Sequence, residues 1–499
     1  MGEAWDRLLT KINELEDISV ALRLLNWDQQ VMMPPKAAAA RARSVATLGA
    51  ISHQRLCDPE VGALLDELQG DDSLDETKTA SVRVLRRDYD RATKIPERLV
   101  RDLAETSAIA YQAWTEARPA DDFRMLEPHL TKLVALKKEE ADSIGWSQER
   151  YDALLDEYEP EMTTKEVEQI FAELVRGLVP LAERVLAAVN ERPDFVHETY
   201  ATGPQNDFSQ WLVEILGFDK KSGRLDTSPH PFTIPISIGD VRQTTRLDEK
   251  DLLFSITGSM HETGHALYEQ GIPEEMSGLP AGRVPSLGLH ESQSRLWENQ
   301  VGRSRSFTDF MLPHLKERFS EQLGLVTPEE FHRALNHPER SLIRVIADEL
   351  TYNLHIAFRF EVETAMFRDE LEVSDLPGVW DEAIEKTVGI RPSNKKDGVL
   401  QDVHWSIGAL GYFPTYTLGN LYAAAFWAKA TEELPAVNED LRRGDGSRLL
   451  AWLREKIHSR GYLQPAKETA EEVLGEPLTA KPLLDYLETK YSEIYDVAS

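Results

Sequence analysis

Apolar residues recur at helical spacing along most of this 499-residue chain. The stretches 126–144, 167–189 and 342–366 place apolar side chains three and four residues apart, with charged side chains between them. This pattern is typical of helices that bury one face. The stretch 37–48, rich in Ala and Arg, also favours a helix. No fixed-period repeat or low-complexity linker divides the chain, so we predict a mainly α protein with one domain over residues 1–499, arranged as two lobes around a groove.

One region interrupts the helical pattern. Residues 228–246 read SPHPFTIPISIGDVRQTTR, which is rich in Ile, Val and Thr and punctuated by Pro and Gly. β-Branched residues favour strands, and Pro and Gly favour the turns between them. The region therefore predicts a small sheet of two or three strands, directly before a helix predicted over 251–270.

Cysteine content and charge exclude several classes of protein. Cys57 is the only cysteine, so intramolecular disulfides, cysteine-rich zinc sites and iron–sulfur clusters are excluded. Any metal must be held by His and carboxylate side chains. The 56 Lys and Arg against 86 Asp and Glu give a net charge of −30, which disfavours nucleic acid and anionic membranes as partners. The same excess fits either a high-salt habitat or ordinary solubility.

We expect neither an export signal nor a membrane span. The chain begins MGEAWDRLLTKINELED, which lacks the basic start and apolar run of a signal peptide. Residues 403–428 contain no Asp, Glu, Lys or Arg, but they include His404, Pro414 and several Gly and Thr residues. These favour a buried, partly irregular segment over a membrane span. We predict a cytoplasmic protein.

The sequence HETGH predicts a metal site. It lies in the predicted helix 251–270, for which Gly271 is a plausible C-cap. Residues four apart share a helix face, so His261 and His265 can bind one ion, with Glu262 beside it to take a proton from a water. Zinc suits such ligands. The alternative is a buried helix whose two histidines are merely hydrogen-bonded.

A third ligand is expected further along the chain. The next such segment reads HESQS, and its Glu291 can return on a neighbouring helix to complete a set of two His and one Glu. Spacing alone leaves an ordinary surface acid as an equal alternative.

Arg344 is a candidate for binding a substrate anion. It is the only positive charge between residues 342 and 358, so it can face a carboxylate inside a groove. The alternative is a pair with Asp348, four residues on in the helix predicted there, and the local sequence favours that alternative.

Three other polar side chains lie in or near the uncharged segment. Tyr412 and Tyr416 can donate hydrogen bonds to a developing oxyanion, or they can simply pack as buried aromatics. His404 is either a proton donor or a hydrogen-bonded core histidine, and the sequence favours the second interpretation.

Together these segments resemble the carboxypeptidase Taq family of metallocarboxypeptidases. The matching blocks follow the family's order: NWDQQVMMPP at 26–35, HPF at 230–232, DVRQT at 240–244, HETGH at 261–265, HESQS at 290–294, IRVIAD at 343–348 and GVLQDVHW at 398–405. Chance agreement of so many ordered blocks is negligible, and the metal motifs show no departure from the family pattern.

The resemblance implies a large helical clamp with a deep central groove, a small flanking β-sheet and zinc at the groove floor. It also implies a homodimer that removes single residues from the C-terminus of peptides. Side-chain preference is broad in this family, although C-terminal Pro is usually refused, and Co²⁺ often replaces Zn²⁺.

Carried over residue by residue, the resemblance makes His261, His265 and Glu291 the metal ligands. Glu262 becomes the general base and then the acid. Arg344 becomes the candidate clamp for the terminal carboxylate of the substrate.

The resemblance also implies roles for the groove walls. The blocks DVRQT and GVLQDVHW are expected to shape and bound the groove, which makes Arg242 and His404 candidate substrate-binding residues. The oxyanion role falls on Tyr412 or Tyr416, a less direct match.

Two other functions remain open from the sequence. A metallo-oligopeptidase that cuts internally or releases dipeptides would use the same chemistry in a different groove. A helical peptide-binding protein with a structural metal would not need a base at Glu262. The first prediction remains a zinc carboxypeptidase acting on peptides with a free C-terminal carboxylate.

Overall fold

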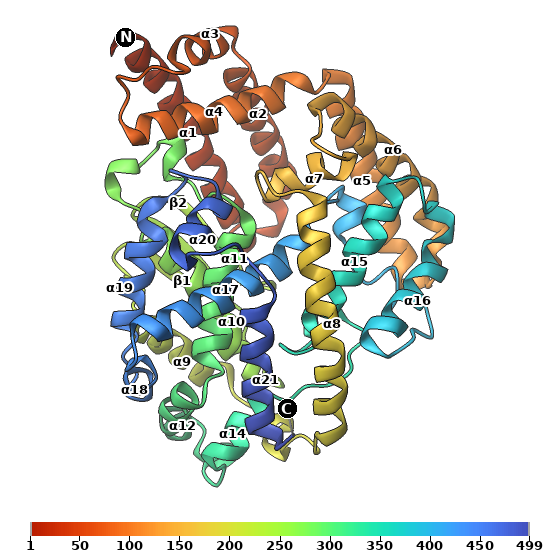
Figure 1. The fold of residues 1–499 in the computed structure, drawn as a ribbon, viewed down its shortest axis with the longest axis vertical. Helices are drawn as coiled ribbons and strands as arrows, with labels where there is room; N and C mark the ends of the chain where they lie inside the picture. The colour runs from red at the N-terminus through yellow and green to blue at the C-terminus, as the bar shows by residue number, and fades with distance from the viewer. Residues whose placement is uncertain (1, 498–499) are drawn as a thin grey trace.

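The computed structural model describes residues 2–497, most of which lie in helices (Figure 1). The N-terminal helices are α1 (Gly2–Val31), α2 (Ala38–Leu56), α3 (Pro59–Leu68), α4 (Glu76–Lys94), α5 (Glu97–Ala120), α6 (Glu127–Ile144), α7 (Arg150–Tyr158), α8 (Thr164–Ala188) and α9 (Thr202–Ile215). Helices were predicted over 37–48, 126–144 and 167–189, and α2, α6 and α8 confirm them.

The remaining helices follow the sheet. They are α10 (Leu252–Glu269), α11 (Leu287–Arg295), a π-helix (Leu296–Gly302), α12 (Arg305–Arg318), α13 (Ser320–Leu323), α14 (Pro328–Leu335), α15 (Tyr352–Phe367), α16 (Leu376–Val388), α17 (Pro414–Glu433), α18 (Val437–Arg442), α19 (Ser447–Lys456), α20 (Ala466–Leu474) and α21 (Lys481–Tyr495). The predicted mainly α fold is confirmed.

The predicted small sheet has three strands in the order β1-β3-β2. The strands are β1 (Gly223–Thr227), β2 (Thr233–Ser237) and β3 (Asp240–Thr245). β3 pairs in parallel with β1 and antiparallel with β2. β1 lies before residues 228–246, the region for which the sequence predicted strands. The sheet contacts α10 and α1, so it lies beside the helix that carries HETGH.

The helix predicted over 342–366 is wrong in its first third. Only α15, from Tyr352, is helical, and the chain before it forms a short 3₁₀ turn at Arg344–Ile346. Asp348 ends the irregular segment, because its carboxylate accepts the Leu350 and Thr351 amides at 2.9 and 3.2 Å. Gln401 holds the segment from the other side by accepting the Arg344 amide at 2.9 Å.

The segment 403–428, which has no charged residue, is mostly buried, as the sequence predicts. It begins with a 3₁₀ turn at His404–Ile407 and continues into α17. Within the described part of the chain, none of the helices combines the length and the hydropathy that crossing a bilayer requires.

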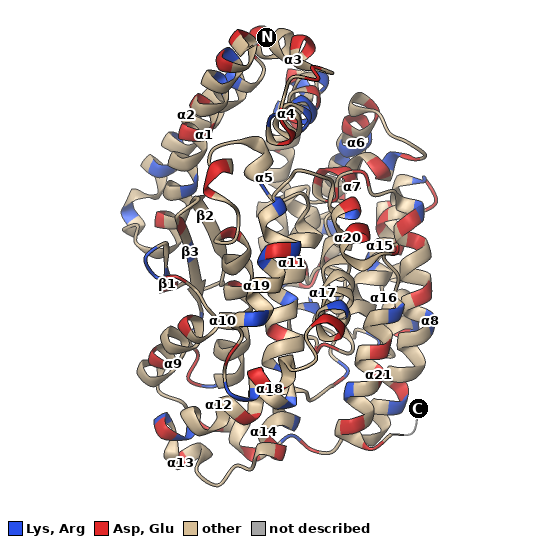
Figure 2. Ribbon diagram, turned by 60° about the vertical axis from the view of Figure 1, so that its left-hand side comes forward, with Lys and Arg blue, Asp and Glu red and all other residues tan. Residues whose placement is uncertain are grey.

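Buried apolar side chains form two clusters. The larger cluster contains residues between Ala110 and Tyr491 and includes buried side chains of α10, α11 and α17. The smaller joins α1, α3 and α4, the red and orange helices at the top of Figure 1. Charged side chains of both signs are spread over the helices rather than gathered on one of them (Figure 2), so the excess of acid marks no single binding face.

Two glycines allow α11 to pack tightly between α10 and α17. A Cβ on Gly264 of α10 would lie 2.4 Å from the carbonyl oxygen of Gln293, and one on Gly419 of α17 would lie 2.5 Å from Cγ of Glu291. Both distances are shorter than van der Waals contact. The three helices therefore meet at backbone distance at the point where HETGH and HESQS face each other.

This packing gives a test of the fold. Gly264→Ala should destabilise the protein by about 1–3 kcal/mol, because overpacking at a rigid backbone contact forces the helices apart. The measurement is the free energy of unfolding in denaturant. The control is Gly258→Ala on the same helix, where the new Cβ would meet its nearest atoms at 3.9 and 4.0 Å. It should be neutral or stabilising by up to about 1 kcal/mol. Equal changes in the free energy of unfolding for the two substitutions would contradict the close approach of α10 and α11 at Gly264.

Candidate active site

Helix α10 presents the HETGH sequence toward α11. Its first turn is capped by Asp251, whose carboxylate accepts the Phe254 amide at 3.0 Å. The prediction that Gly271 is the C-cap is wrong, because Gln270 is the C-cap residue and the φ of Gly271 is not positive. Gly271 instead leaves room for His458, which a Cβ would approach to 2.6 Å.

His261, His265 and Glu291 converge on one point. Their ligand atoms all lie within 4.8 Å of one another, and Oε2 of Glu291 is 3.5 Å from Nε2 of His261 and 3.3 Å from Nε2 of His265. Among the residues that the structure describes, no other group of three or more His, Cys, Asp and Glu converges in this way. Two imidazoles and one carboxylate form a donor set that fits zinc.

A second layer of charge fixes these ligands. Nδ1 of His261 donates to Oε2 of Glu298 at 2.9 Å, which leaves Nε2 free to face the cluster. Nε of Arg295 donates to Oε1 of Glu291 at 2.7 Å, which leaves Oε2 for the cluster. Burial alone would raise the pKa of both carboxyls, but Arg295 holds the pKa of Glu291 and of Glu298 well below the usual range.

His265 is neutral in this environment. Burial, together with the adjacent His290, lowers the pKa of His265 to about 3. The two rings stack with centroids 4.3 Å apart, and His290 in turn lies 3.1 Å from a carboxylate oxygen of Glu269. A neutral imidazole has the lone pair that a metal ligand needs.

Glu262 lies beside the cluster without belonging to it. Its carboxylate accepts the hydroxyl of Thr233 at 2.7 Å, and the same hydroxyl contacts its backbone carbonyl at 2.9 Å. Thr233 belongs to β2, so the sheet orients this carboxylate. Burial raises the pKa of Glu262 above its ordinary value.

Arg344 does not form the helical pair with Asp348, so that alternative is wrong. Its Nε donates to Oδ1 of Asp402 at 2.9 Å, and Nη1 donates to the Tyr352 hydroxyl at 3.1 Å. Arg344 is buried, and burial alone would lower its pKa. The adjacent Asp402 carboxylate instead raises the pKa of Arg344 above its usual range. The Asp348 carboxylate instead accepts the Leu350 and Thr351 amides in the turn before α15.

Tyr412 and Tyr416 are half-buried, with ring centroids 5.3 Å apart. Burial raises the pKa of both phenols, so both remain protonated donors at neutral pH. The guanidinium of Arg344 lies 5.1 Å from the centroid of the Tyr416 ring, so this ring borders Arg344.

His404 contacts this pair. Its Nε2 lies 3.3 Å from the Tyr416 hydroxyl. Burial lowers the pKa of His404 to about 4, so it is neutral at pH 7 and offers a hydrogen bond rather than a charge.

Arg242 stays apart from these residues. It pairs with Asp240 at 2.8 Å on the same strand, and its guanidinium stacks on the Trp27 ring at 4.3 Å. These contacts join the sheet to α1 and leave Arg242 outside both the metal cluster and the contacts of Arg344.

Several residues of the site escaped the sequence analysis. Arg295 and Glu298 hold the ligands, and their signal was their spacing of four and seven residues after Glu291, which is typical of one helix face. Asp402 lies in the block GVLQDVHW and Tyr352 in the helix predicted over 342–366, but neither had an assigned role. Their pairing with Arg344 joins segments that are distant in the chain.

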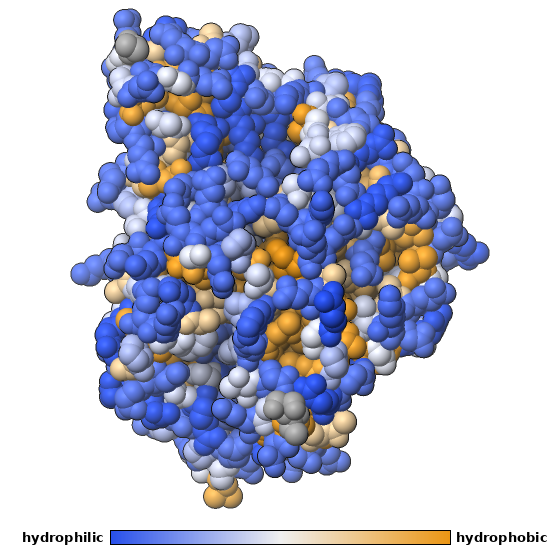
Figure 3. Space-filling view, in the orientation of Figure 1, coloured by the Kyte–Doolittle hydropathy of each residue, from blue (hydrophilic) through white to orange (hydrophobic). Residues whose placement is uncertain are grey.

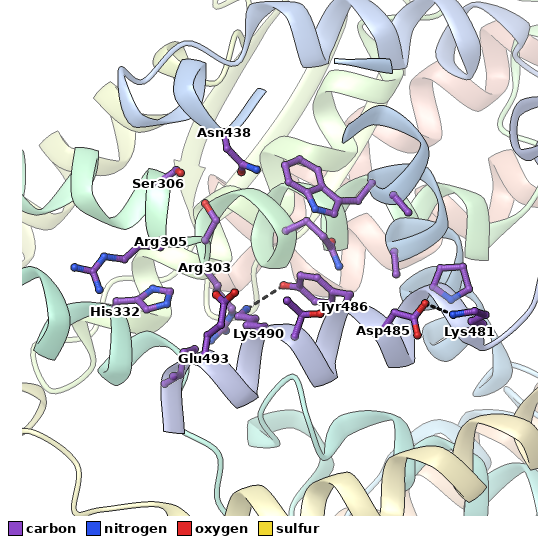
Figure 4. A pocket seen from close by; sticks show the side chains of 18 of the residues that line it. Arg303, Arg305, Ser306, His332, Asn438, Lys481, Asp485, Tyr486, Lys490 and Glu493 are labelled. Carbon is purple, nitrogen blue, oxygen red and sulfur yellow. Dashed lines mark hydrogen bonds and ion pairs between the residues drawn. The ribbon is translucent and has the colours of Figure 1, made fainter. Parts of the chain in front are cut away.

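Two cavities flank the cluster. One of about 840 Å³ is bounded by α1, α2, α4 and the sheet, and Glu269 lies in its wall. The other, of about 1080 Å³, is lined by Arg303, His332 and Lys490 (Figure 4). Arg303 donates to Glu298 at 3.2 Å, so the π-helix separates this second cavity from the metal cluster. The face seen in Figure 3 is mainly hydrophilic, with hydrophobic patches recessed between polar ones.

Comparison with known proteins agrees with this geometry. The family model described as "Carboxypeptidase Taq (M32) metallopeptidase" matches residues 7–491. The chain belongs to the M32 family of metallocarboxypeptidases. It is therefore a metal-dependent hydrolase that acts on peptides.

Similar M32 proteins cover the whole chain. Thermostable carboxypeptidase 1 of Thermus thermophilus is 45% identical over 506 residues, covering 99% of both chains, and carboxypeptidase 1 of Bacillus subtilis is 38% identical over 97% of both. The crystal structure of the M32 carboxypeptidase from Deinococcus radiodurans superposes with a TM-score of 0.97 at 42% identity. That superposition covers 99% of this chain and 100% of the other.

The geometry predicts a graded loss of metal. Glu291→Ala should abolish tight metal binding, because it removes a donor, and added zinc should restore activity only in part. Glu298→Gln should weaken metal affinity by about 10–100-fold, since it removes the anion that orients His261.

Metal content after dialysis against a chelator measures both effects. The control is Glu269→Gln, a buried acid that pairs with a histidine but lies outside the donor set, and it should retain its metal. Normal metal content in Glu291→Ala would move the third ligand elsewhere.

Proposed function

We propose that this protein is a zinc carboxypeptidase that releases single residues from the C-terminus of peptides, with residues 1–499 acting as one domain. The observation that carries the proposal is a His–His–Glu cluster beside the buried carboxylate of Glu262, together with the buried Arg344, whose guanidinium lies 5.1 Å from the centroid of the Tyr416 ring. The cluster accounts for hydrolysis, and the arginine accounts for attack at a chain end.

His261, His265 and Glu291 are the metal ligands in this proposal. A zinc ion held there would polarise the scissile carbonyl and lower the pKa of the attacking water to about 7. Cobalt can take the place of zinc, since it accepts the same nitrogen and oxygen donors.

Glu262 is the general base and then the general acid. Its hydrogen bond from Thr233 fixes the carboxylate beside the cluster, and its raised pKa brings it nearer to the pH at which it must both take and return a proton. It takes a proton from the attacking water and gives it to the departing amine.

Tyr412 and Tyr416 are the oxyanion donors. Both phenols keep their protons, so either can donate a hydrogen bond to the charge that develops on the carbonyl oxygen. His404 orients Tyr416 through the 3.3 Å contact and contributes to the substrate-binding wall.

Arg344 binds the terminal carboxylate of the substrate. Only a chain end presents a carboxylate one residue beyond the cut, so a guanidinium at this place makes the enzyme an exopeptidase. Recognition of that carboxylate does not depend on the side chain, which supports broad specificity. Refusal of C-terminal Pro follows the family, and Arg242 contacts more distant parts of the peptide from the sheet.

The resemblance to the family also supports a homodimer acting in the cytoplasm on peptides. The net charge of −30 supports the absence of nucleic-acid and membrane partners. The second candidate remains a metallo-oligopeptidase, which would not need a buried arginine for a free carboxylate.

Glu262→Gln tests the chemistry. Turnover should fall by at least about 10²-fold because the general base is lost, while metal content stays near wild type because Glu262 is not a ligand. Steady-state kinetics with metal analysis measure both quantities. His261→Ala is the contrasting variant and should lose metal and activity together. Near-normal turnover in Glu262→Gln would refute the proposed mechanism.

Arg344→Ala tests the exopeptidase proposal. Catalytic efficiency on free-acid peptides should fall by roughly 10²–10³-fold, because an anion in a water-poor site loses its partner. Wild type and variant should be similarly poor on C-terminally amidated peptides. Arg242→Ala is the control and should leave the preference for the free acid in place. Equal losses on both peptides would assign the carboxylate to another cation.

A further inference from the structure

Asp402 lies between two arginines and gives one oxygen to each. Nε and Nη2 of Arg344 lie 2.9 Å from Oδ1. Nε and Nη2 of Arg359, which comes from α15, lie 2.8 and 2.7 Å from Oδ2. The carboxylate is thus shared between them.

This group carries an excess positive charge inside the protein. Arg359 is 0% exposed and Arg344 is 5% exposed. Among the described residues, Asp402 is the only carboxylate that forms an ion pair with either of them. Burial lowers the pKa of Arg359 to about 10, which still leaves it protonated at neutral pH. Two cations therefore share one anion.

Among the described residues, no neighbouring titratable group forms a further ion pair with Arg344 or Arg359. Burial lowers the pKa of His404 to about 4 and that of His355 to about 3, so both are neutral. Glu363, one turn along α15, forms no ion pair with either arginine, since its carboxyl accepts hydrogen bonds from Tyr151, Trp405 and the Gly411 amide, and burial raises its pKa to about 7.

Arg359 cannot bind the substrate itself. Its Nη1 donates to the carbonyl of His355 at 2.7 Å, and its guanidinium packs on the rings of Trp380 at 4.5 Å and Phe358 at 4.8 Å. Arg344 is different, because its other partner is the neutral hydroxyl of Tyr352. An incoming carboxylate can therefore complete the charge balance only at Arg344.

We propose that Arg359 is a positioning residue that sets the preference for a free C-terminus. By engaging half of Asp402, it prevents that carboxylate from neutralising Arg344, and the subsite keeps one uncompensated positive charge for the substrate carboxylate. This inference rests on the proposed role of Arg344. It assigns specificity to a residue that the substrate never contacts.

The charge count gives a sharp test with the metal-loaded protein. Arg359→Met leaves one arginine and one carboxylate, so the subsite becomes neutral. KM for a free-acid peptide should rise roughly 10–100-fold, the range of a charge-assisted hydrogen-bond contribution, with kcat much less affected. Activity on the matching amidated peptide should change little. Arg359→Lys keeps the charge and should retain most of the preference.

The double variant Arg359→Met/Asp402→Asn restores the uncompensated positive charge at Arg344, because it removes one cation and one anion together. It should recover a preference for the free acid to within a few-fold of wild type. A merely structural role for Arg359 predicts the opposite, since the second substitution removes another buried contact. If only the double variant folds, its preference for free-acid over amidated peptides decides alone. Retention of that preference supports the proposal, and its loss overturns the proposal.

The outcomes separate this inference from the proposed function. If wild type does not prefer free-acid over amidated peptides, the exopeptidase proposal fails and the inference fails with it. If wild type shows the preference and Arg359→Met keeps it with an unchanged KM, only the role of Arg359 is overturned. A fall in kcat without a rise in KM would also overturn it.

Discussion

Glu291 reaches the two histidines only because three helices meet at backbone distance. Gly264 on one side and Gly419 on the other leave no room for a Cβ against α11, and Cγ of Glu291 occupies the space beside Gly419. Close packing of this kind is rigid, since interiors pack as densely as organic crystals. The convergence of donor atoms within 4.8 Å follows from that contact. The outer carboxylate Glu298 then depends on the π-helix that continues α11.

Five of the buried acids form two groups with different partners. Glu291, Glu298 and Asp402 pair with arginines, which keep their carboxyl pKa values low despite burial. Glu159 and Glu363 accept mainly neutral donors, and burial raises their pKa values to about 8 and about 7. The first group lies at the His–His–Glu cluster and beside Arg344. The second group joins segments of backbone, at the start of α11 and in the turn after His404.

Much of the site could be predicted from the sequence because it is local. His261, Glu262 and His265 lie within one turn of a helix, so spacing alone places them together. Glu291 required the resemblance, since its spacing allowed a surface acid equally well. Helices α6 and α8 followed from apolar periodicity. The start of α15 did not, because the Asp348 carboxylate holds a turn before the helix while the apolar pattern continues through that turn. The prediction of Gly271 as a helix cap was wrong because a glycine after a helix can also serve tertiary packing. Here it leaves room for His458.

The sequence by itself determined the mainly α class, the small sheet near residues 228–246 and the helix face with His261, Glu262 and His265. Each of these features depends on residues that are close together in the sequence. Only the tertiary structure decided which partner each buried charge takes. Arg344 pairs with Asp402 and not with Asp348, which is nearer in the sequence, since Asp348 accepts hydrogen bonds from the turn before α15. Arg359 shares Asp402 from another helix. Pairings of this kind depend on which charges are desolvated together, and desolvation is a property of the packed chain.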